Sequence, residues 1–315
     1  KEQKISLTTA GTVKQLCEEF YERTVEGKIK RPDIIREQLD GDLIPKLGRM
    51  RIAEVKPMDI DGMIRAILER GSPVMANRVL ATTKAVFSYA IRRHWIEQNP
   101  AAAFRRADAG GEEKARTRAL SDEELVALFK ALQAAGSAFR IYDLAVKLLL
   151  VTGVRVSELI EAPWAEFDLE ADEPVWRIPA GRIKTRKEMA LRDFTIPLSP
   201  VVVEWLREIK RLSVASDYVF PARRRVSKLT MSPATMNWAL GEVKHGLEHF
   251  TLHDLRRTAA TRMQDDRLGA DKVQPFIVER VLNHTLEGVM AVYNHAEYEA
   301  DRIDAAKKLE RVILE

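Results

Sequence analysis

Residues 251–293 read TLHDLRRTAATRMQDDRLGADKVQPFIVERVLNHTLEGVMAVY. This stretch contains His253, Arg256, His284 and Tyr293. Their side chains supply two imidazoles, one guanidinium fork and one phenol, a set that can hold a phosphodiester and attack it without a metal ion. A single His-x-x-Arg pair on a helix is more often a solvated face. The interpretation therefore depends on what the rest of the chain adds.

The composition is that of an ordinary globular chain, long enough at 315 residues for two domains. The net charge of +4 permits a polyanionic partner without requiring one. Cys17 is the only cysteine, which excludes an intrachain disulfide and a cysteine-rich zinc module and fits a reducing compartment. The histidines are not spaced as metal ligands, so no metal is expected.

The chain has no apolar run near the roughly 20 residues of a membrane span, and no signal peptide opens it. These features predict a cytoplasmic protein without a membrane partner. The sequence begins at Lys1 rather than at a methionine, so we expect it to be a fragment of a longer chain.

Apolar residues at helical spacing predict four helices in the first hundred residues, at about 12–21, 32–45, 57–68 and 73–94. Thr12 is the expected N-cap of the first helix, and Pro57 opens the third. Together these helices make a small all-helical domain. Arg92 and Arg93 end its fourth helix, where a solvated face is a more ordinary reading than a binding surface.

A basic linker is predicted at 105–118, where Arg105, Arg106 and further basic residues accompany Gly110-Gly111 and few apolar groups. A linker of this kind can lie along a phosphate backbone and let two domains close around a duplex. Linkers are also charged for solubility alone, and the sequence does not decide between the two.

The second domain opens with a capping box, Ser121 and Glu124, and continues with a buried helix through 142–151. That helix stops at Thr152-Gly153. An arginine placed directly after such a break, Arg155, can point into a cleft. Glu158 lies one turn further on and is placed to hold Arg155 or a neighbour.

Short β-like runs at 175–178 and 194–197 flank a strongly basic stretch, which is either a hairpin or a mobile loop. Lys184 could reach across a groove from this stretch. Further helices are expected at about 200–212, 232–245, 252–263, 276–282 and 297–314. His253 and Arg256 share one helix face. The apolar side of the last helix packs either on its own domain or on a neighbouring protomer.

The motifs TGVRVSEL at 152–159, a basic hairpin with Lys184, HDLR at 253–256, LNH at 282–284 and a tyrosine nine residues later together resemble the tyrosine recombinases. The strings WRIP at 176–179 and YNHAEY at 293–298 are similar to the integrases of prophages and genomic islands. The resemblance covers about 120–298. The first hundred residues match only as a helical core-binding domain of suitable size.

The resemblance implies a mainly α (α+β) fold in three parts. Residues 1–104 would form a helical core-type DNA-binding domain, 105–118 the basic linker, and 119–315 a mostly helical catalytic domain with a small antiparallel sheet. Integrases of this type often carry a further N-terminal domain for arm-type DNA sites, which we expect to lie outside this fragment.

The resemblance also implies a metal- and ATP-independent strand transfer through a 3′-phosphotyrosine. Six residues would carry it: Arg155 and Arg256 as clamps on the phosphate oxygens, His253 as general acid or base, His284 as hydrogen-bond donor, Lys184 as proton donor to the 5′ oxygen, and Tyr293 as nucleophile. A phenol of pKa about 10 needs such a base and positive field. Tyr298 is a competing nucleophile, but the spacing from His284 favours Tyr293.

The implied partners are double-stranded DNA attachment sites, further copies of the chain in a tetramer on DNA, a DNA-bending host factor and a directionality factor, at the bacterial nucleoid. No cofactor is implied. Most contacts should go to phosphates. The residues expected to bind DNA are Arg92, Arg93, Arg105, Arg106, Arg182, Arg186, Lys187, Arg223 and Arg224.

Two alternatives stay open. One is a housekeeping recombinase that resolves chromosome dimers by the same chemistry. The other is a DNA-binding regulator that keeps the fold without exchanging strands, against which the complete set of six residues argues.

Overall fold

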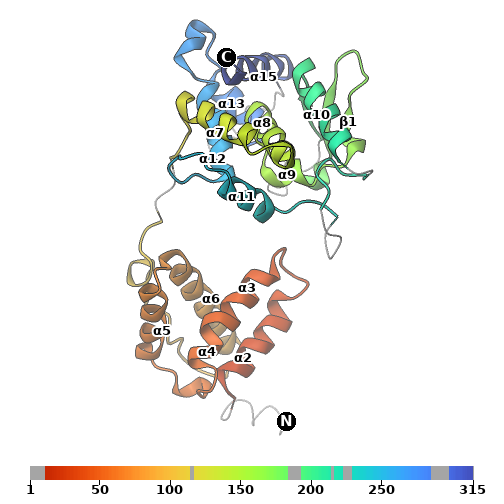
Figure 1. The fold of residues 1–315 in the computed structure, drawn as a ribbon. Coiled ribbons are helices and arrows are strands. Elements are labelled where there is room, and N and C mark those ends of the chain that lie inside the picture. The colour runs from red at the N-terminus through yellow and green to blue at the C-terminus, as the bar shows by residue number, and fades with distance from the viewer. Residues whose placement is uncertain are drawn as a thin grey trace. The chain divides into compact units, whose positions relative to one another are not determined.

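The computed structural model describes residues 11–113, 117–183, 193–213, 216–222, 229–284 and 298–314. The chain divides into two compact units, Lys1–Ala115 and Arg116–Glu315, which we call the N-terminal and C-terminal units (Figure 1). Each unit has a hydrophobic core of its own.

The N-terminal unit is helical, with α2 (Val13–Phe20), α3 (Pro32–Gln38), α4 (Ile44–Leu47), α5 (Pro57–Glu69) and α6 (Pro73–Arg92) (Figure 1). The predicted cap of the first helix is confirmed, because the Thr12 hydroxyl accepts the amide hydrogen of Gln15 at 3.4 Å. Proline opens both α5 and α6, as expected. Leu16, Ile60 and Phe87 lie fully buried between these helices.

The helix predicted at 32–45 is present as one helical run over 32–47, but its hydrogen bonding changes in the middle. A π-helical turn, Leu39–Leu43, separates α3 from α4, and a second π-helical turn, Tyr21–Val25, continues α2. Pro45 gives a reason for the first, because it has no amide hydrogen to continue the α-helical ladder and its ring crowds the preceding turn. A wider turn ahead of Pro45 relieves that conflict.

Part of the predicted linker is anchored rather than free. Arg106–Asp108 forms a 3₁₀ turn, and the buried Asn77 of α6 accepts from the Gly110 amide at 2.8 Å and donates to the Gly111 carbonyl at 3.0 Å. A Cβ on Gly110 would lie 1.8 Å from the carbonyl oxygen of Pro73, so only glycine fits there. Residues 106–111 of the predicted linker are therefore held against α6 in the N-terminal unit.

The C-terminal unit is built around the buried helix α8 (Arg140–Thr152), which packs against α7, α10, α11, α12 and α15 (Figure 1). The bounds of the other helices are α7 (Asp122–Ala134), α9 (Val156–Ile160), α10 (Pro200–Leu212), α11 (Pro233–Glu242), α12 (Leu252–Arg262), α13 (Pro275–Val281) and α15 (Glu299–Leu314). The predicted capping box of α7 is confirmed, since Ser121 accepts from the Glu124 amide at 3.3 Å and Glu124 from the Ser121 amide at 2.9 Å.

A small antiparallel sheet lies beside these helices, in the order β1 (Phe167–Asp168), β2 (Val175–Ile178), β3 (Phe194–Pro197). The two predicted strands are β2 and β3, and the short β1 was not predicted. Trp176 faces Phe167 and Ile196 in register and stacks on the Phe167 ring at 4.9 Å. The predicted fold class, mainly helical with a small antiparallel sheet, is confirmed.

The last helix packs on its own unit. Ala305 and Leu309 of α15 join the core of the C-terminal unit, against α13 and α8. Arg302 donates a hydrogen bond to the Thr195 carbonyl of β3, and its guanidinium lies 4.6 Å from the centre of the Phe194 ring. Of the two arrangements left open for this helix, the structure shows packing in cis.

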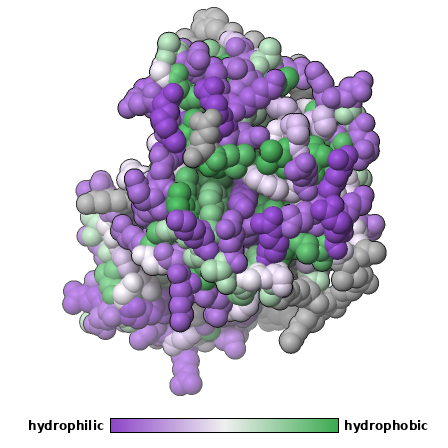
Figure 2. All heavy atoms as spheres, turned by 45° about the horizontal axis from the view of Figure 1, so that its top comes forward, coloured by the Kyte–Doolittle hydropathy of each residue, from purple (hydrophilic) through white to green (hydrophobic). Residues whose placement is uncertain are grey.

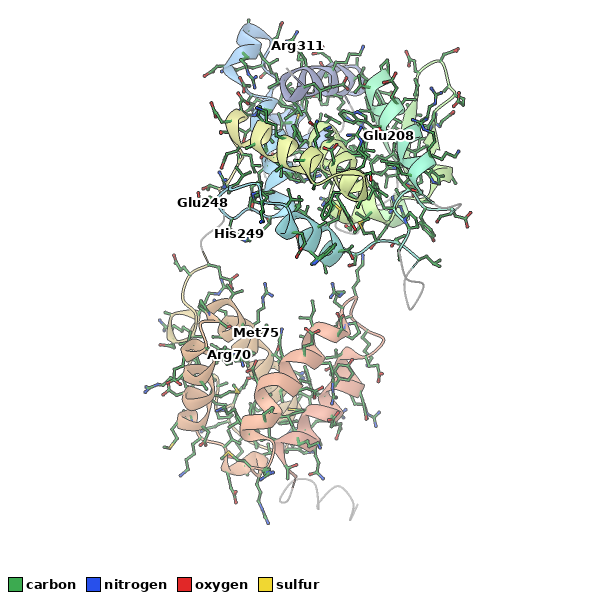
Figure 3. The ribbon with its side chains drawn as sticks, in the orientation of Figure 1. Arg70, Met75, Glu208, Glu248, His249 and Arg311 are labelled. Carbon is green, nitrogen blue, oxygen red and sulfur yellow. The ribbon has the colours of Figure 1, made fainter. Side chains whose placement is uncertain are left out.

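Polar side chains dominate the surface around gathered apolar groups in the view of Figure 2. Ion pairs join some neighbouring helices of the C-terminal unit. Arg140 of α8, for example, donates to both carboxylate oxygens of Glu208 on α10, at 2.7 and 2.8 Å (Glu208 is labelled in Figure 3).

In the described part of the chain, no helix combines the length and the apolar content that crossing a membrane requires.

Candidate active site

The turn between α8 and α9 fixes Arg155. Gly153 ends α8 in the left-handed region at φ 61°, and Arg155 is the N-cap of α9. The buried carboxylate of Glu158 accepts two hydrogen bonds from Arg155, one from its backbone amide and one from Nη1, each 2.8 Å long. Arg155 Nη2 also lies 3.4 Å from the Asn283 carbonyl oxygen. The guanidinium is thus held on two sides.

Arg256 projects from α12 into the interior and is only 4% exposed. Its Nη1 donates to the Gly153 carbonyl and its Nη2 to the Leu282 carbonyl. Arg256 therefore joins α12 to the turn before Arg155 and to the end of α13. Burial, and then the charge of Arg155, lowers the pKa of Arg256 to about 10, so it remains a cation at neutral pH.

His284 follows α13 and is turned back toward that helix. Asn283 adopts a left-handed φ of 50°, and the His284 amide then donates to the Glu279 carbonyl at 2.8 Å. The same turn brings His284 Nδ1 to 2.7 Å from the Glu279 carboxylate. Burial lowers the pKa of His284, the positive charges of Arg256 and Arg155 lower it further, and Glu279 opposes the shift.

His253 lies on α12, three residues before Arg256, with its side chain exposed. Partial desolvation lowers its pKa, and the nearby charges of Arg257 and Arg256 add to that shift. Both histidines are therefore largely neutral at pH 7. A neutral imidazole has one N–H donor and one acceptor nitrogen, which suits proton transfer.

Arg155, His253, Arg256 and His284 come together in the C-terminal unit. The charge of Arg256 lowers the pKa of both histidines, and the charge of Arg155 lowers the pKa of Arg256. Two fixed guanidinium groups and two neutral imidazoles are suited to an anion such as a phosphodiester. Across the described ranges, no three His, Cys, Asp or Glu side chains are grouped so that they could hold a metal ion.

Several predicted site residues lie outside the described residues: Lys184, Arg186, Lys187, Arg223, Arg224 and Tyr293. Their roles stay predictions. Along the sequence, Lys184 follows the described residue Arg182 by two positions, and Tyr293 follows His284 by nine.

The predicted DNA contacts divide into two groups. In the N-terminal unit, Arg92, Arg93, Arg105 and Arg106 are exposed and stay candidates for phosphate contacts. Arg182 is different, because its Nε and Nη2 donate to the carboxylate of the buried Glu166 at 2.6 and 2.7 Å. Nε and Nη2 of Arg182 are thus engaged inside the protein, and its contact with DNA stays a prediction.

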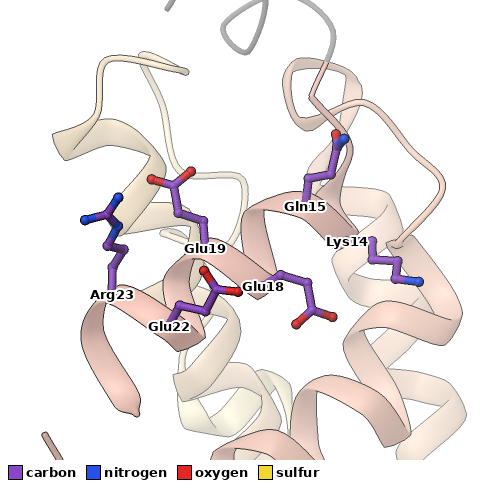
Figure 4. Close-up of a pocket in the computed structure, with 6 residues that line it drawn as sticks. All are labelled: Lys14, Gln15, Glu18, Glu19, Glu22 and Arg23. Atoms are coloured by element: carbon purple, nitrogen blue, oxygen red, sulfur yellow. The ribbon is translucent and has the colours of Figure 1, made fainter. Parts of the chain in front are cut away.

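A hollow of about 390 Å³ in the N-terminal unit is not suited to the same chemistry (Figure 4). It lies along α2 and the π-helical turn after it. Three carboxylates and only two cations line it, together with one amide, so it does not favour an anion. The lining residues are Lys14, Gln15, Glu18, Glu19, Glu22 and Arg23.

Sequence reasoning did not identify Glu279 and Glu166 as part of the site. Glu279 is five residues from His284, and only the left-handed turn at Asn283 brings them together. Glu166 is sixteen positions from Arg182, across β1 and β2. A leucine and a glycine, Leu282 and Gly153, contribute backbone oxygens, for which side-chain patterns give no signal.

Replacing Glu279 with glutamine is expected to lower the pKa of His284 further below 6.5, because the carboxylate opposes the effects of burial, Arg256 and Arg155. The neutral imidazole favours the folded state above pH 6.5, and that contribution is lost as the pH falls toward the lowered pKa. NMR titration of His284 measures the change, and His245, with a pKa lowered mainly by its own burial, is the internal control. A higher pKa of His284 in the variant would contradict the expected coupling.

Two family models match the chain. The model described as "Phage integrase family" matches residues 118–300, and "Phage integrase central domain" matches residues 13–107. One model thus matches within each unit. All four described residues of the candidate site lie in the range matched by the "Phage integrase family" model.

Two curated relatives are similar along most of the chain. The prophage integrase IntZ of Escherichia coli K12 is 27% identical over 298 residues, which is 93% of this chain and 69% of the relative. The integrase of Enterobacteria phage P4 is 27% identical over 310 residues, 96% of this chain and 69% of the relative. The chain thus spans 69% of the length of each.

A solved structure shares the fold. It is a lambda integrase tetramer bound to a Holliday junction, with a TM-score of 0.67, 18% sequence identity, and coverage of 94% of this chain and 81% of that one. At this identity the likeness shows the fold alone.

Proposed function

The chain belongs to the phage integrase family and is a site-specific recombinase of the tyrosine class, and we propose that it cleaves and rejoins DNA through a 3′-phosphotyrosine on Tyr293. The observation that supports this most is the pair Arg155 and Arg256. Each is fixed by protein acceptors, and both lie with His253 and His284 in one electrostatic cluster. Such a cluster stabilises the charge that develops on a phosphate under attack.

The proposed reaction has two transesterification steps. In the first, the Tyr293 oxygen attacks phosphorus, the P–O5′ bond breaks, the phenol proton goes to His253, and Lys184 protonates the departing 5′ oxygen. In the second, the 5′ hydroxyl of a partner strand gives its proton to Lys184 and attacks phosphorus, the P–O bond to Tyr293 breaks, and His253 returns the proton to the departing phenol oxygen. One phosphodiester is formed for each one cleaved, so the reaction needs no ATP.

Three further features belong to the proposal. The lambda integrase neighbour is a tetramer on a Holliday junction, which supports duplex DNA attachment sites and self-association for this chain. The names of the prophage and phage relatives support integration or excision of a mobile element rather than chromosome-dimer resolution. A DNA-bending host factor and a directionality factor are the additional partners that the family resemblance implies.

Incubation with DNA fragments that span the ends of the element, including versions nicked near the expected cleavage position, tests the proposal directly. A nick lets the short 5′ product diffuse away, so that the covalent complex accumulates. We expect a protein–DNA adduct at the 3′ phosphate that maps to Tyr293. DNA binding without any adduct would instead favour a regulator on the same fold.

Replacing Lys184 with alanine is expected to slow cleavage by about 10²- to 10⁴-fold, the usual contribution of a general acid, with a much smaller change in DNA binding. A substrate with sulfur in place of the 5′ bridging oxygen should restore most of the rate, because a thiolate leaves without protonation. Lys130→Ala, at an exposed position of α7, is the control and should cleave normally. Equal losses in binding and cleavage, or failure of the sulfur substrate to rescue, would contradict the role of Lys184 as an acid.

A further inference from the structure

The carboxylate of Glu166 is buried beside β2 and accepts hydrogen bonds from two side chains. Trp176 donates through Nε1 at 2.9 Å, and Arg182 donates through Nε and Nη2 at 2.6 and 2.7 Å. The Glu166 side chain is 5% exposed and that of Arg182 23%. The guanidinium and the carboxylate thus form a bidentate pair with a single orientation.

Arg182 also connects this ion pair to the end of α9. Its Nη2 donates to the backbone carbonyl of Glu158 at 3.0 Å. In a longer helix the Ala162 amide would donate a hydrogen bond to the Glu158 carbonyl. Because α9 ends at Ile160, the Ala162 amide donates to the Leu159 carbonyl instead, at 3.2 Å. Arg182 therefore satisfies a C-terminal carbonyl of α9.

Glu158, whose backbone carbonyl accepts from Arg182, also orients Arg155. The Glu158 carboxylate accepts hydrogen bonds from both the backbone amide and Nη1 of Arg155. Because α9 has only five residues, few internal hydrogen bonds fix it, and its position depends on contacts from outside. A continuous series of polar contacts therefore runs from Glu166 through Arg182 and Glu158 to Arg155.

Stability alone does not account for this ion pair. Replacing a buried ion pair with uncharged groups of similar volume is often neutral or stabilising, whereas removal of one partner is strongly destabilising. What the charged pair adds is a defined geometry, since a bidentate arginine accepts few alternative orientations.

We propose that Glu166 and Arg182 are positioning residues for recombination: they fix the backbone of Glu158, and through its side chain they place the Arg155 guanidinium. This inference rests on the proposed role of Arg155 as a ligand of the scissile phosphate. A displacement of about 1 Å at a catalytic group can cost on the order of 10²-fold in rate, so loss of the pair should affect cleavage more than binding.

The test compares a double variant with its single variants. Arg182→Met leaves Glu166 buried without its partner, so it should lower the melting temperature. Adding Glu166→Gln removes the second charge and keeps an acceptor for Trp176, so the melting temperature should recover. We expect cleavage of a nicked substrate by this double variant to stay about 10- to 100-fold below wild type, with DNA binding within about threefold.

Arg182→Lys separates the two contacts of the arginine. Lysine keeps the charge next to Glu166 but cannot form the planar fork that reaches the carboxylate and the Glu158 carbonyl together. We expect a melting temperature near wild type with a reduced cleavage rate. The proposal would be overturned if either Arg182→Lys or the double variant had both a wild-type melting temperature and a wild-type cleavage rate. The ion pair would then have a purely structural role.

The matched control is the bidentate pair of Arg140 and Glu208, which contacts neither Arg155 nor Glu158. Arg140→Met with Glu208→Gln should leave cleavage unchanged, because Lys147 still pairs with the Asp143 that Arg140 also contacts.

In an Arg155→Lys background, the Glu166→Gln and Arg182→Met changes should lower cleavage little further, since they act through Arg155. If these two changes lowered cleavage as much in the Arg155→Lys background as in the wild-type chain, the proposal would also be overturned. Failure of the wild-type chain to form any adduct would count against the proposed function itself.

Discussion

Replacing Tyr293 with phenylalanine is expected to abolish covalent attachment to DNA while leaving the affinity for the core site within a few-fold of wild type. The substitution removes only the attacking oxygen, and no other group in the proposed site can form a 3′-phosphodiester bond with the strand. Loss of a nucleophile that acts with its base costs several orders of magnitude, and we expect at least about 10⁴-fold here. Denaturing gels of the nicked substrate measure the adduct, and mobility shifts measure binding.

Tyr298→Phe is the matched control. The Tyr298 ring lies 5.1 Å from that of Phe276, edge to face, and packs against the core of the C-terminal unit just before α15. This contact gives Tyr298 a packing role, so its phenylalanine variant should keep both the ring contact and the adduct. An adduct in Tyr293→Phe, or its loss only in Tyr298→Phe, would transfer the nucleophile role to Tyr298.

The sequence predicts the helices well where local signals agree. The Thr12 and Ser121 caps, the prolines that open α5 and α6, and the apolar spacing of α8 all act within one or two turns, so they can be recognised without the rest of the fold. The prediction fails where a non-local contact decides. Asn77, more than thirty positions away, anchors the segment at Gly110 and Gly111, and pairing with β2 makes Phe167–Asp168 a strand.

The same division applies to the site. The sequence motifs identify Arg155, His253, Arg256 and His284, because the chemistry requires those side chains. They do not reveal what holds them. Two left-handed residues, Gly153 and Asn283, turn the chain so that backbone oxygens meet Arg256 and the Glu279 carboxylate meets His284. These partners depend on backbone conformation, for which glycine and asparagine are permissive but not diagnostic.

Arg256→Lys is the second substitution with a large expected effect. Cleavage of the nicked substrate should fall by about 10²- to 10³-fold, the usual cost of losing one donor to a developing negative charge. Lysine keeps the positive charge, so an effect of this size would show that geometry matters beyond charge. The Arg256 guanidinium spans the Gly153 and Leu282 carbonyls, and a single ammonium cannot reproduce that planar fork.

Arg257→Lys provides the control for Arg256→Lys. Arg257 is the next residue on α12, is 33% exposed, and pairs with Asp254 at 2.6 Å, so its change to lysine keeps the local charge without touching the two carbonyls. It should cleave at nearly the wild-type rate. Because Arg256 also connects α12 with the ends of α8 and α13, the melting temperature of each variant must be measured with the rate. Near-wild-type cleavage by a well-folded Arg256→Lys variant would mean that charge alone suffices, and the fork geometry would lose its proposed role.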